Sequence, residues 1–495
     1  MNKKLINLAG LAVATSMVLG ACAQPTPITI TKEVIKEVPK EVIKEVIKEV
    51  PGKEVVVTKE VVKEVKVAAG PRTQVRWYVG LGTGADKGQI PTERKFVEKY
   101  NASQDKIELL VEFVSNVNGA VARDNLKAQI AAGNAPDIVG PVGKYGRAQF
   151  KGSWLDVSPL IKENNTDLNG VDQALIDFVK DDGVQVGLPY ALFPSFIYVN
   201  KDLFDEAKLP LPPQKAGAQY QGKPWDLAAV QDLAMKLTVD KNGKDATQAG
   251  FDKKNIKQWG FDQQWANGRA ELTGIGGPGL PYDADNNAKL PDGWKTAAHW
   301  IYDAMWKTGF EPTKAARGSE LLSQPNEFAS GNMAMTWSHT WYMCCLGDKV
   351  KNWVAVAPPM INGKILSKLH GDTFAILKDG KEPKAAYQAM IAMMADPDLQ
   401  VLYNGLPARP ADRPAYFKLQ NETRKLKDGQ VPWDMMVDLL KYPDVPNHET
   451  WMPNMIKSED RINAFQDLLR SKEGLNVDDE LAKLEKDLDV IFKAK

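Results

Sequence analysis

The chain has 495 residues, of which 63 are basic and 63 acidic, so its formal net charge is zero. Proteins that bind nucleic acids concentrate positive charge, so this balance argues against a nucleic-acid partner. The chain has only three cysteines, two of them adjacent, which excludes a small fold held together by many disulfides.

The N-terminus has the layout of an export signal. Lys3 and Lys4 precede a mostly apolar run, residues 5–19, that is shorter than the roughly 20 residues a membrane span needs. "LGAC", residues 19–22, resembles the lipobox of bacterial lipoproteins, in which the cysteine is acylated after cleavage. We therefore predict a signal peptide over 1–21 and lipidation of Cys22. The alternative is an ordinary signal peptide with an incidental cysteine.

Residues 31–67 repeat Lys-Glu-Val-X with period four. The β-branched Val and Ile side chains disfavour a helix, and Pro39 and Pro51 interrupt it. The repeat also lacks the alternation of a half-buried strand. We predict that residues 22–71 are a solvated tether that holds a globular body off a membrane. A coiled-coil stalk is the alternative, because valines four residues apart lie near one helical face.

The remaining part of the chain, roughly 420 residues, is long enough for two domains. Strands are expected at 74–80, 106–114 and 137–142, and helices at 90–101 and 121–134. This alternation predicts an α/β fold with a parallel sheet covered by helices. Such sheets bind ligands in the loops beyond the carboxyl ends of their strands.

Asp137 stands at the start of the third strand, directly after a helix that ends in a Gly-Asn pair. We expect its carboxylate to accept hydrogen bonds from backbone N–H groups as the chain enters the strand. Direct contact with a ligand is the alternative.

A last helix is expected from the C-terminal sequence "NVDDELAKLEKDLDVIF". Asn476 is a suitable N-cap, because its side chain can accept from the first free backbone N–H groups. One face of the helix carries apolar residues at helical spacing: Leu481, Leu484, Leu488 and Ile491.

Four stretches of the body resemble, in order and spacing, the carbohydrate-binding family of ABC-importer solute-binding proteins, which includes maltodextrin-binding proteins. They are "AAGNAPDIV" (131–139), "GLPYALFPSFIYVNKDLFDEAKL" (187–209), "EFASGNMAMTWSHTW" (327–341), and "VAVAPPMINGK" (354–364) followed by "GDTFAIL" (371–377). The resemblance implies a two-lobe periplasmic-binding-protein fold, type II-like, with two or three crossing strands and a ligand cleft between the lobes. It places lobe 1 at 72–195 plus 373–412 and lobe 2 at 199–371 plus 413–495.

A sugar site needs aromatic faces for the C–H surface of the ring and charged groups for the hydroxyls. In the family pattern Trp341 falls where a tryptophan stacks on a sugar ring, and Asp86 and Lys87 match residue types that bind sugar hydroxyls. The other candidates are chosen because they lie in loops or near the crossovers between the lobes. The ligand-binding candidates are Trp341, Trp337, Trp265, Asp86, Lys87, Tyr190, Phe193, Asp372 and Arg409. Core packing of the tryptophans, and a solvated turn at 86–87, are the alternatives. For Trp433 and Trp451 we expect packing, with ligand contact by one of them as the alternative.

Two departures from the family pattern argue against maltose itself as the ligand. The loop "GPVGKYG" lacks the tryptophan and the acid found there in maltodextrin binders, and no glutamate lies near Phe193. A different, smaller saccharide is expected.

Cys344 and Cys345 are adjacent, so their Cα atoms are about 3.8 Å apart, below the usual disulfide span of roughly 4.4–6.8 Å. A bridge there is strained but possible, and export makes oxidation available. We hypothesise a vicinal disulfide beside Trp341 that helps to shape the cleft, with two free thiols as the alternative.

These features predict an exported monomer, lipid-anchored to the outer face of the cell membrane, that captures a mono- or oligosaccharide for the permease of an ABC importer. We expect no enzyme activity, no cofactor and no metal. The four histidines, His299, His339, His370 and His448, show no metal-ligand spacing. No nucleophile elbow and no conspicuous carboxylate pair appear either. The alternatives are a binder of another small solute such as a polyamine, a surface-anchored glycan-degrading enzyme, or an adhesin.

Overall fold

The computed structural model describes residues 43–46, 58–61, 71–114 and 120–494, and the chain divides into two compact units, 1–68 and 69–495. The predicted signal peptide and Cys22 lie outside the described residues. In the first unit, β1 (Ile43–Val46) and β2 (Thr58–Val61) pair antiparallel. The sequence analysis predicted neither strand. The Val and Ile residues that disfavour a helix are the ones that favour extended backbone.

The second unit begins with the predicted strand-helix alternation: β3 (Thr73–Val79), α1 (Ile90–Ser103), β4 (Ile107–Phe113), α2 (Ala120–Ala131) and β5 (Ile138–Val142). The strand β3 pairs in parallel with both β4 and β5. Val75, Trp77 and Val79 are fully buried. These five elements and the parallel sheet are therefore confirmed, and they form the first lobe.

Asp137 performs the expected backbone role. Its Oδ2 accepts from the N–H of Arg76 at 2.8 Å, and its Oδ1 accepts from the N–H groups of Lys381 (2.8 Å) and Glu382 (3.1 Å). Glu382 directly precedes α11 (Pro383–Ala395), so one carboxylate joins β3, β5 and the start of that helix.

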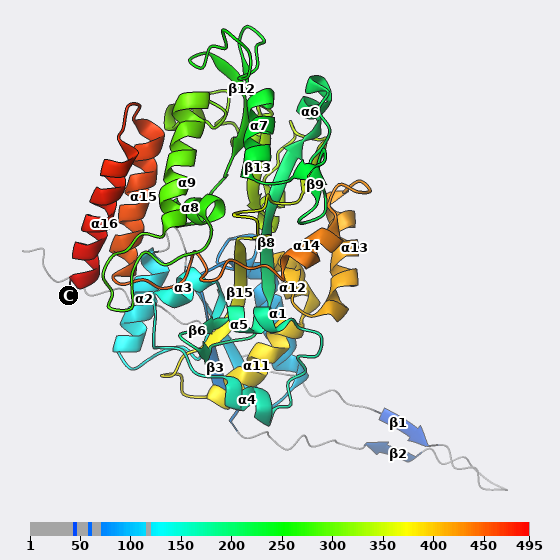
Figure 1. Ribbon diagram of the computed structural model, residues 1–495. Coiled ribbons are helices and arrows are strands. Elements are labelled where there is room, and N and C mark those ends of the chain that lie inside the picture. Colours follow the sequence, from blue (N-terminus) through cyan, green and yellow to red (C-terminus); the bar gives the residue numbers. More distant parts are fainter. Residues whose placement is uncertain (1–42, 47–57, 62–70, 115–119, 495) are drawn as a thin grey trace, which may run out of the picture. The chain divides into compact units, whose positions relative to one another are not determined.

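The second lobe is built on β12 (Ile256–Asp262), β13 (Met333–His339) and β14 (Trp353–Val356), with β11 (Val239–Asp240) at the edge. Its helices include α7 (Leu227–Leu237), α8 (Gly268–Gly276), α9 (Asp292–Asp303), α15 (Met455–Ser471) and α16 (Val477–Lys493). In Figure 1, α9, α15 and α16 lie side by side on one flank of this lobe. Asn476 caps α16 as predicted, and its side chain accepts from the N–H groups of Asp478 and Asp479.

Two long strands connect the lobes. The first four residues of β8 (Ala191–Asn200) pair with β15 (Leu369–Ile376), and its later residues, from Ser195, pair with β13 and β14. The strand β15 in turn pairs with β8 through Leu369–Asp372 and with β5 from Thr373 onward. The strand order is β11-β12-β13-β8-β15-β5-β3-β4, with β14 and β16 (Leu406–Pro407) also on β8.

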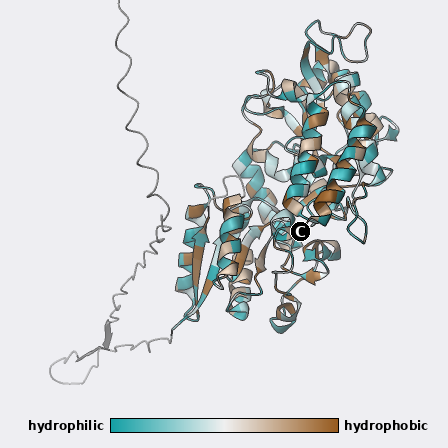
Figure 2. Ribbon diagram, turned by 90° about the vertical axis from the view of Figure 1, so that its left-hand side faces the viewer, coloured by the Kyte–Doolittle hydropathy of each residue, from teal (hydrophilic) through white to brown (hydrophobic). Residues whose placement is uncertain are grey.

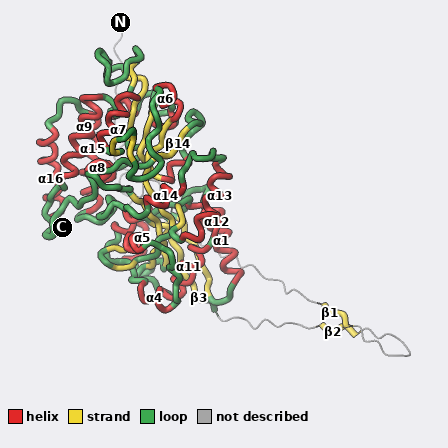
Figure 3. The backbone as a smooth tube through the Cα atoms, turned by 45° about the vertical axis from the view of Figure 1, so that its right-hand side comes forward, coloured by secondary structure: helices red, strands yellow, loops and turns green. Residues whose placement is uncertain are grey.

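Helices lie on both sides of this shared sheet (Figure 3), which makes the unit a two-lobe α/β structure. In Figure 2 the helices carry hydrophilic and hydrophobic residues along their length, as expected when one face packs on the sheet. No helix among the described residues is long and apolar enough to span a bilayer.

Shorter elements complete the unit. In the first lobe they are α3 (Lys144–Ala148), α4 (Ser158–Glu163), α5 (Gln173–Phe178), β6 (Lys180–Asp181), β7 (Val184–Gln185) and α12 (Pro397–Tyr403). Elsewhere they are α6 (Lys201–Ala207), β9 (Gln219–Tyr220), β10 (Lys223–Pro224), α10 (Lys314–Arg317), α13 (Arg413–Arg424) and α14 (Trp433–Leu439). Single turns η1 (Ala304–Thr308), η2 (Phe328–Ser330), η3 (Thr340–Cys344) and η4 (Pro410–Asp412) link some of them.

Candidate functional site

Two tryptophans stack where β12 and β13 end. Trp341 lies in η3, directly after β13, and Trp265 follows β12; their ring centroids are 5.7 Å apart and their planes differ by 4°. The Trp265 side chain is 51% exposed and its φ is 58°, in the left-handed region. Bulky residues avoid this region because it costs roughly 1–3 kcal/mol, and such strain gathers at functional sites.

Of the two indoles, Trp265 is the more exposed and Trp341 is half-buried. Trp341 also stacks on His339, with 5.2 Å between ring centroids and 16° between planes. The ring of Tyr342 packs edge-on against Trp265, with 5.0 Å between ring centroids and 83° between planes. The hydroxyl of Tyr342 in turn donates to Asn326 Oδ1 at 2.7 Å. The pair is therefore a braced aromatic platform.

Three histidines gather beside this platform. The register places His339 of β13 opposite Ser195 and His370 of β15 opposite Phe193, two residues apart on β8. The ring centroids of His339 and His370 are consequently 4.3 Å apart, and His448 lies 4.9 Å from His370. The sequence analysis noted only that the four histidines lack metal-ligand spacing along the chain. The structure nevertheless brings three of them together from distant strands and a late segment.

A charged pair lies at the centre of this group. His370 Nδ1 is 3.1 Å from Glu449 Oε1. Burial acts to lower the pKa of His370, but the charge of Glu449 and the hydrogen bond between the two side chains outweigh it and raise that pKa. Burial likewise acts to raise the pKa of Glu449, and His370 outweighs it, so this pKa falls to about 2. Both shifts favour the charged forms of the two side chains.

Asp372, two residues after His370, behaves differently. Burial, reinforced by the negative charge of Glu449, raises the pKa of Asp372 to about 6. A Cβ on Gly143 would lie 3.1 Å from Asp372 Oδ1, so the missing side chain lets the backbone before α3 approach this carboxylate closely. The predicted candidate Asp372 thus stands beside the histidine group as a weak acid.

A cavity of about 570 Å³ opens between the first lobe and residues 443–451, which lead into α15 of the second lobe. Lys144 and Arg147 of α3 line it and are held by the carboxylate of Asp181, with Arg147 Nε 2.8 Å from Asp181 Oδ2. Trp451 lines the opposite wall, and Lys151 Nζ lies 3.5 Å from its ring centroid. The cavity is therefore an interlobe site that combines an indole with charged groups.

Charged residues of the cavity and charged residues beside the histidines influence one another. Glu449 influences the pKa of Lys144, and Arg147 influences that of Asp372. The two residues next to the His448–Glu449 pair, Asn447 and Thr450, line the cavity. We therefore treat the platform, the histidine group and the cavity as one candidate site.

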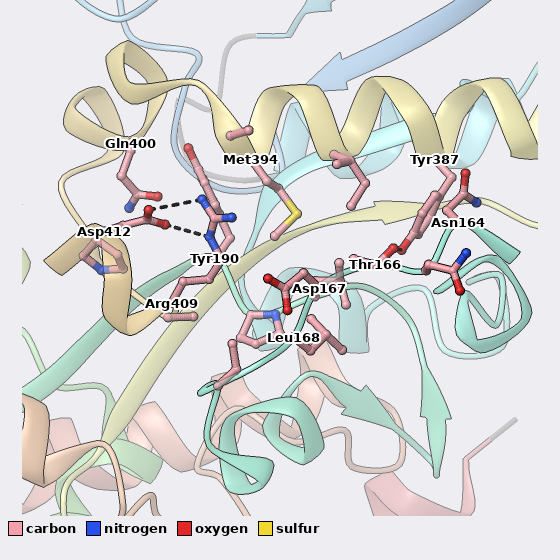
Figure 4. A pocket seen from close by; sticks show the side chains of 18 of the residues that line it. Asn164, Thr166, Asp167, Leu168, Tyr190, Tyr387, Met394, Gln400, Arg409 and Asp412 are labelled. Atoms are coloured by element: carbon pink, nitrogen blue, oxygen red, sulfur yellow. Dashed lines mark hydrogen bonds and ion pairs between the residues drawn. The ribbon is translucent and has the colours of Figure 1, made fainter. Parts of the chain in front are cut away.

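A second cavity, of about 470 Å³, lies within the first lobe (Figure 4). Two predicted site residues, Tyr190 and Arg409, line it. Arg409 is tied to Asp412 by two bonds, Nε–Oδ2 at 2.8 Å and Nη2–Oδ1 at 3.1 Å, which Figure 4 shows. Both residues thus contribute to a cavity that contains neither tryptophan of the platform.

The other candidates lie outside both cavities. Trp337 and Phe193 are buried in the hydrophobic cores, 0% and 5% exposed, because consecutive residues of β13 and β8 are covered on both faces of the sheet. For Trp337 this burial matches the core-packing alternative, and Phe193 is likewise a core residue. Asp86 and Lys87 are exposed in the turn before α1, where the Asp86 carbonyl accepts from the N–H groups of Gln89 and Ile90.

Cys344 and Cys345 form a disulfide at the end of η3. It follows Trp341 by three residues, so the turn that carries the platform is closed by a covalent ring. Trp451 packs against the core of the second lobe, as expected, and it also lines the interlobe cavity.

Two α/β lobes that share crossing strands and enclose a cavity define the class of hinged, periplasmic-type binding proteins. The chain belongs to the family of bacterial extracellular solute-binding proteins, whose model matches residues 95–412. Members of this family are binding proteins, and the family description implies export.

Solved structures share the fold. UspC of M. tuberculosis is 17% identical, with 84% of this chain and 100% of that chain covered and a TM-score of 0.64. An ABC substrate-binding protein of Listeria monocytogenes, in complex with cycloalternan, is 18% identical, with coverage of 86% and 100% and a TM-score of 0.62. A maltose-bound protein of T. maritima is 16% identical, with coverage of 84% and 99% and a TM-score of 0.56. No curated protein sequence matches the chain at a significant level.

Proposed function

We propose that this protein captures a sugar, a mono- or oligosaccharide, outside the cell and delivers it unaltered to an ABC importer. Family membership supports solute capture. Structures with the same fold were solved with cycloalternan, mannotriose and maltose. The observation that carries the proposal is the half-exposed, strained Trp265 braced against Trp341 beside buried polar groups.

The chemistry of the site suits a neutral, hydroxyl-rich ligand. An exposed indole offers a flat apolar face to sugar C–H groups at little cost in side-chain entropy. Glu449 and Asp372 supply carboxylate oxygens, and Lys144 and Arg147 supply cationic donors, which make stronger bonds to hydroxyls than neutral groups do. We propose that lobe closure about β8 and β15 brings these groups onto the sugar.

We further propose how the protein is anchored, which partner it serves and that it leaves its ligand unaltered. Cys22 is acylated, residues 22–71 tether the monomer to the outer face of the membrane, and the permease of the importer is its partner. The protein performs no reaction on the ligand. The disulfide between Cys344 and Cys345 supports the platform by stiffening η3.

Isothermal calorimetry against a panel of mono- and oligosaccharides, with spermidine included, tests the proposal. We expect stoichiometric heat with at least one sugar and recovery of that sugar intact. Trp265→Ala is expected to weaken binding about tenfold or more, because a buried aromatic contact contributes more than about 1 kcal/mol. Trp306→Ala is the control, since Trp306 is a half-buried indole bonded to the Leu469 carbonyl, outside the site.

Three outcomes would contradict the proposal. Binding of spermidine but of no sugar would indicate a polyamine carrier. Release of shortened products would indicate a glycan-degrading enzyme. Equal affinities of the Trp265→Ala and Trp306→Ala variants would remove the platform from the site.

A further inference from the structure

We propose that His370, His448 and Glu449 bind a divalent transition-metal ion at the interlobe site. One ligand atom from each residue lies within 4.8 Å of the other two. Two imidazoles and one carboxylate form a ligand set that Zn²⁺ and similar ions use in sites with an open position. The ion would share Glu449 with the proposed sugar site, but its binding in sugar-free buffer does not depend on sugar capture.

His448 is held in the orientation and tautomer that metal binding needs. Its Nδ1 lies 2.6 Å from Asp444 Oδ2. Asp444 also accepts from the N–H groups of Leu369 (2.9 Å) and His448 (3.0 Å) and from Asn447 Nδ2 (2.8 Å). Because four donors surround the Asp444 carboxylate, it accepts all four hydrogen bonds. His448 Nδ1 is one of these donors, so Nδ1 carries the proton and Nε2 carries the lone pair. A carboxylate behind a histidine is the usual arrangement around protein-bound metals.

Among the described residues, no donor engages the lone pair on His448 Nε2. His448 is 1% exposed, and its Nε2 is buried without a hydrogen-bond partner among the described residues. An unpaired buried polar atom costs on the order of 1–3 kcal/mol. A metal ion beside His370 and Glu449 would engage this atom and would replace the contact between His370 Nδ1 and Glu449 Oε1.

Neighbouring charges favour a cation here. Two further carboxylates lie beside the ligands: Asp444 Oδ2 is 2.6 Å from His448 Nδ1, and Asp372 follows His370 by two residues on β15. Of the nearby cations, Arg147 pairs with the carboxylate of Asp181, and Lys368 Nζ is held by Gln263 Oε1 at 3.0 Å. Three protein ligands would leave a coordination position for water or for an oxygen of the bound solute.

Calorimetric titration of the chelator-treated full chain with Zn²⁺, Co²⁺ or Ni²⁺, in sugar-free buffer, tests the proposal. We expect one ion per chain. His448→Gln and Glu449→Gln are each expected to weaken binding at least tenfold, and Asp444→Asn, which leaves the ligands in place, about 10- to 100-fold. His299→Gln is the matched control, since His299 is exposed and paired with Asp478 at 2.8 Å, outside the group. It should bind the ion as the unaltered chain does.

A second measurement needs no substitution. Diethyl pyrocarbonate modifies accessible histidines, and mass spectrometry locates the products. His370, whose side chain is 26% exposed, should be protected by saturating Zn²⁺, while His299 stays reactive. The proposal is overturned if none of the three ions binds stoichiometrically. It is also overturned if Zn²⁺ leaves His370 as reactive as before, or if a folded His448→Gln variant binds as tightly as His299→Gln.

Discussion

Replacement of Asp137 by alanine tests how one carboxylate stabilises the first lobe. The substitution removes the acceptor of three backbone N–H groups, those of Arg76, Lys381 and Glu382. A hydrogen bond to a charged group contributes about 1.5–3 kcal/mol, so the three together could reach roughly 4.5–9 kcal/mol. Lys381 and Glu382 are exposed, however, and water can replace part of their bonding. We therefore expect Asp137→Ala to lower the free energy of unfolding by about 3 kcal/mol.

Urea unfolding followed by tryptophan fluorescence measures this change, provided that the denaturant slope stays the same. Asp105→Ala is the control, because Asp105 is an exposed carboxylate of the same lobe. Its effect should stay within about 0.5 kcal/mol. A loss below about 1 kcal/mol for Asp137→Ala would refute the reasoning, since the three N–H groups would then be satisfied without the carboxylate.

Three further predictions concern stability and covalent structure. Glu93 is fully buried, which raises its pKa to about 7, so the folded state holds a proton that the unfolded state releases near pH 4.5. Stability should therefore fall as pH rises from about 4.5 through 7, and Glu93→Gln should remove this fall and be more stable at pH 8 by about 3 kcal/mol. Gly276→Ala should destabilise by roughly 1–3 kcal/mol, because its Cβ would lie 2.1 Å from the carbonyl oxygen of Gly293. Alkylation of the unreduced protein should leave Cys344 and Cys345 unlabelled in mass spectra.

Each of these predictions has an outcome that contradicts it. A pH profile of Glu93→Gln that parallels the unaltered chain would show that Glu93 does not titrate differently on folding. Gly88→Ala is the control for Gly276→Ala, since no atom lies within 4 Å of its added Cβ, and equal melting temperatures for the two variants would disprove the steric argument. Label on both cysteines would mean two free thiols.

Local patterns predicted much of the fold. The alternation of Val75, Trp77 and Val79, and the cap at Asn476, depend on neighbouring residues only, and the structure has the corresponding strand and helix. The strands β1 and β2 were missed because the Lys-Glu-Val repeat does not alternate as a half-buried strand does. Pairing across the chain, such as β8 with β15, was expected only from the family resemblance.

The candidate site was harder to predict, because it is made by residues distant in sequence. Trp265 and Trp341 were both named, but the sequence could not show that stacking leaves Trp265 the more exposed of the two. His370 and His448 lie 78 residues apart in the sequence, and only the strand register and the 443–451 segment bring them together. The single local signal was the Asp444 to His448 spacing of four residues, which places a carboxylate against an imidazole.

The shared strand β8 also determines how the two lobes lose their structure. All ten of its residues are buried, and its two ends pair with strands of different lobes. If either lobe melted alone, half of this strand would lose its strand partners and expose its buried apolar side chains to water, which is costly. Heating should therefore give one cooperative calorimetric transition for residues 69–495 instead of two separate ones. Damage confined to one lobe would then lower the melting temperature of both.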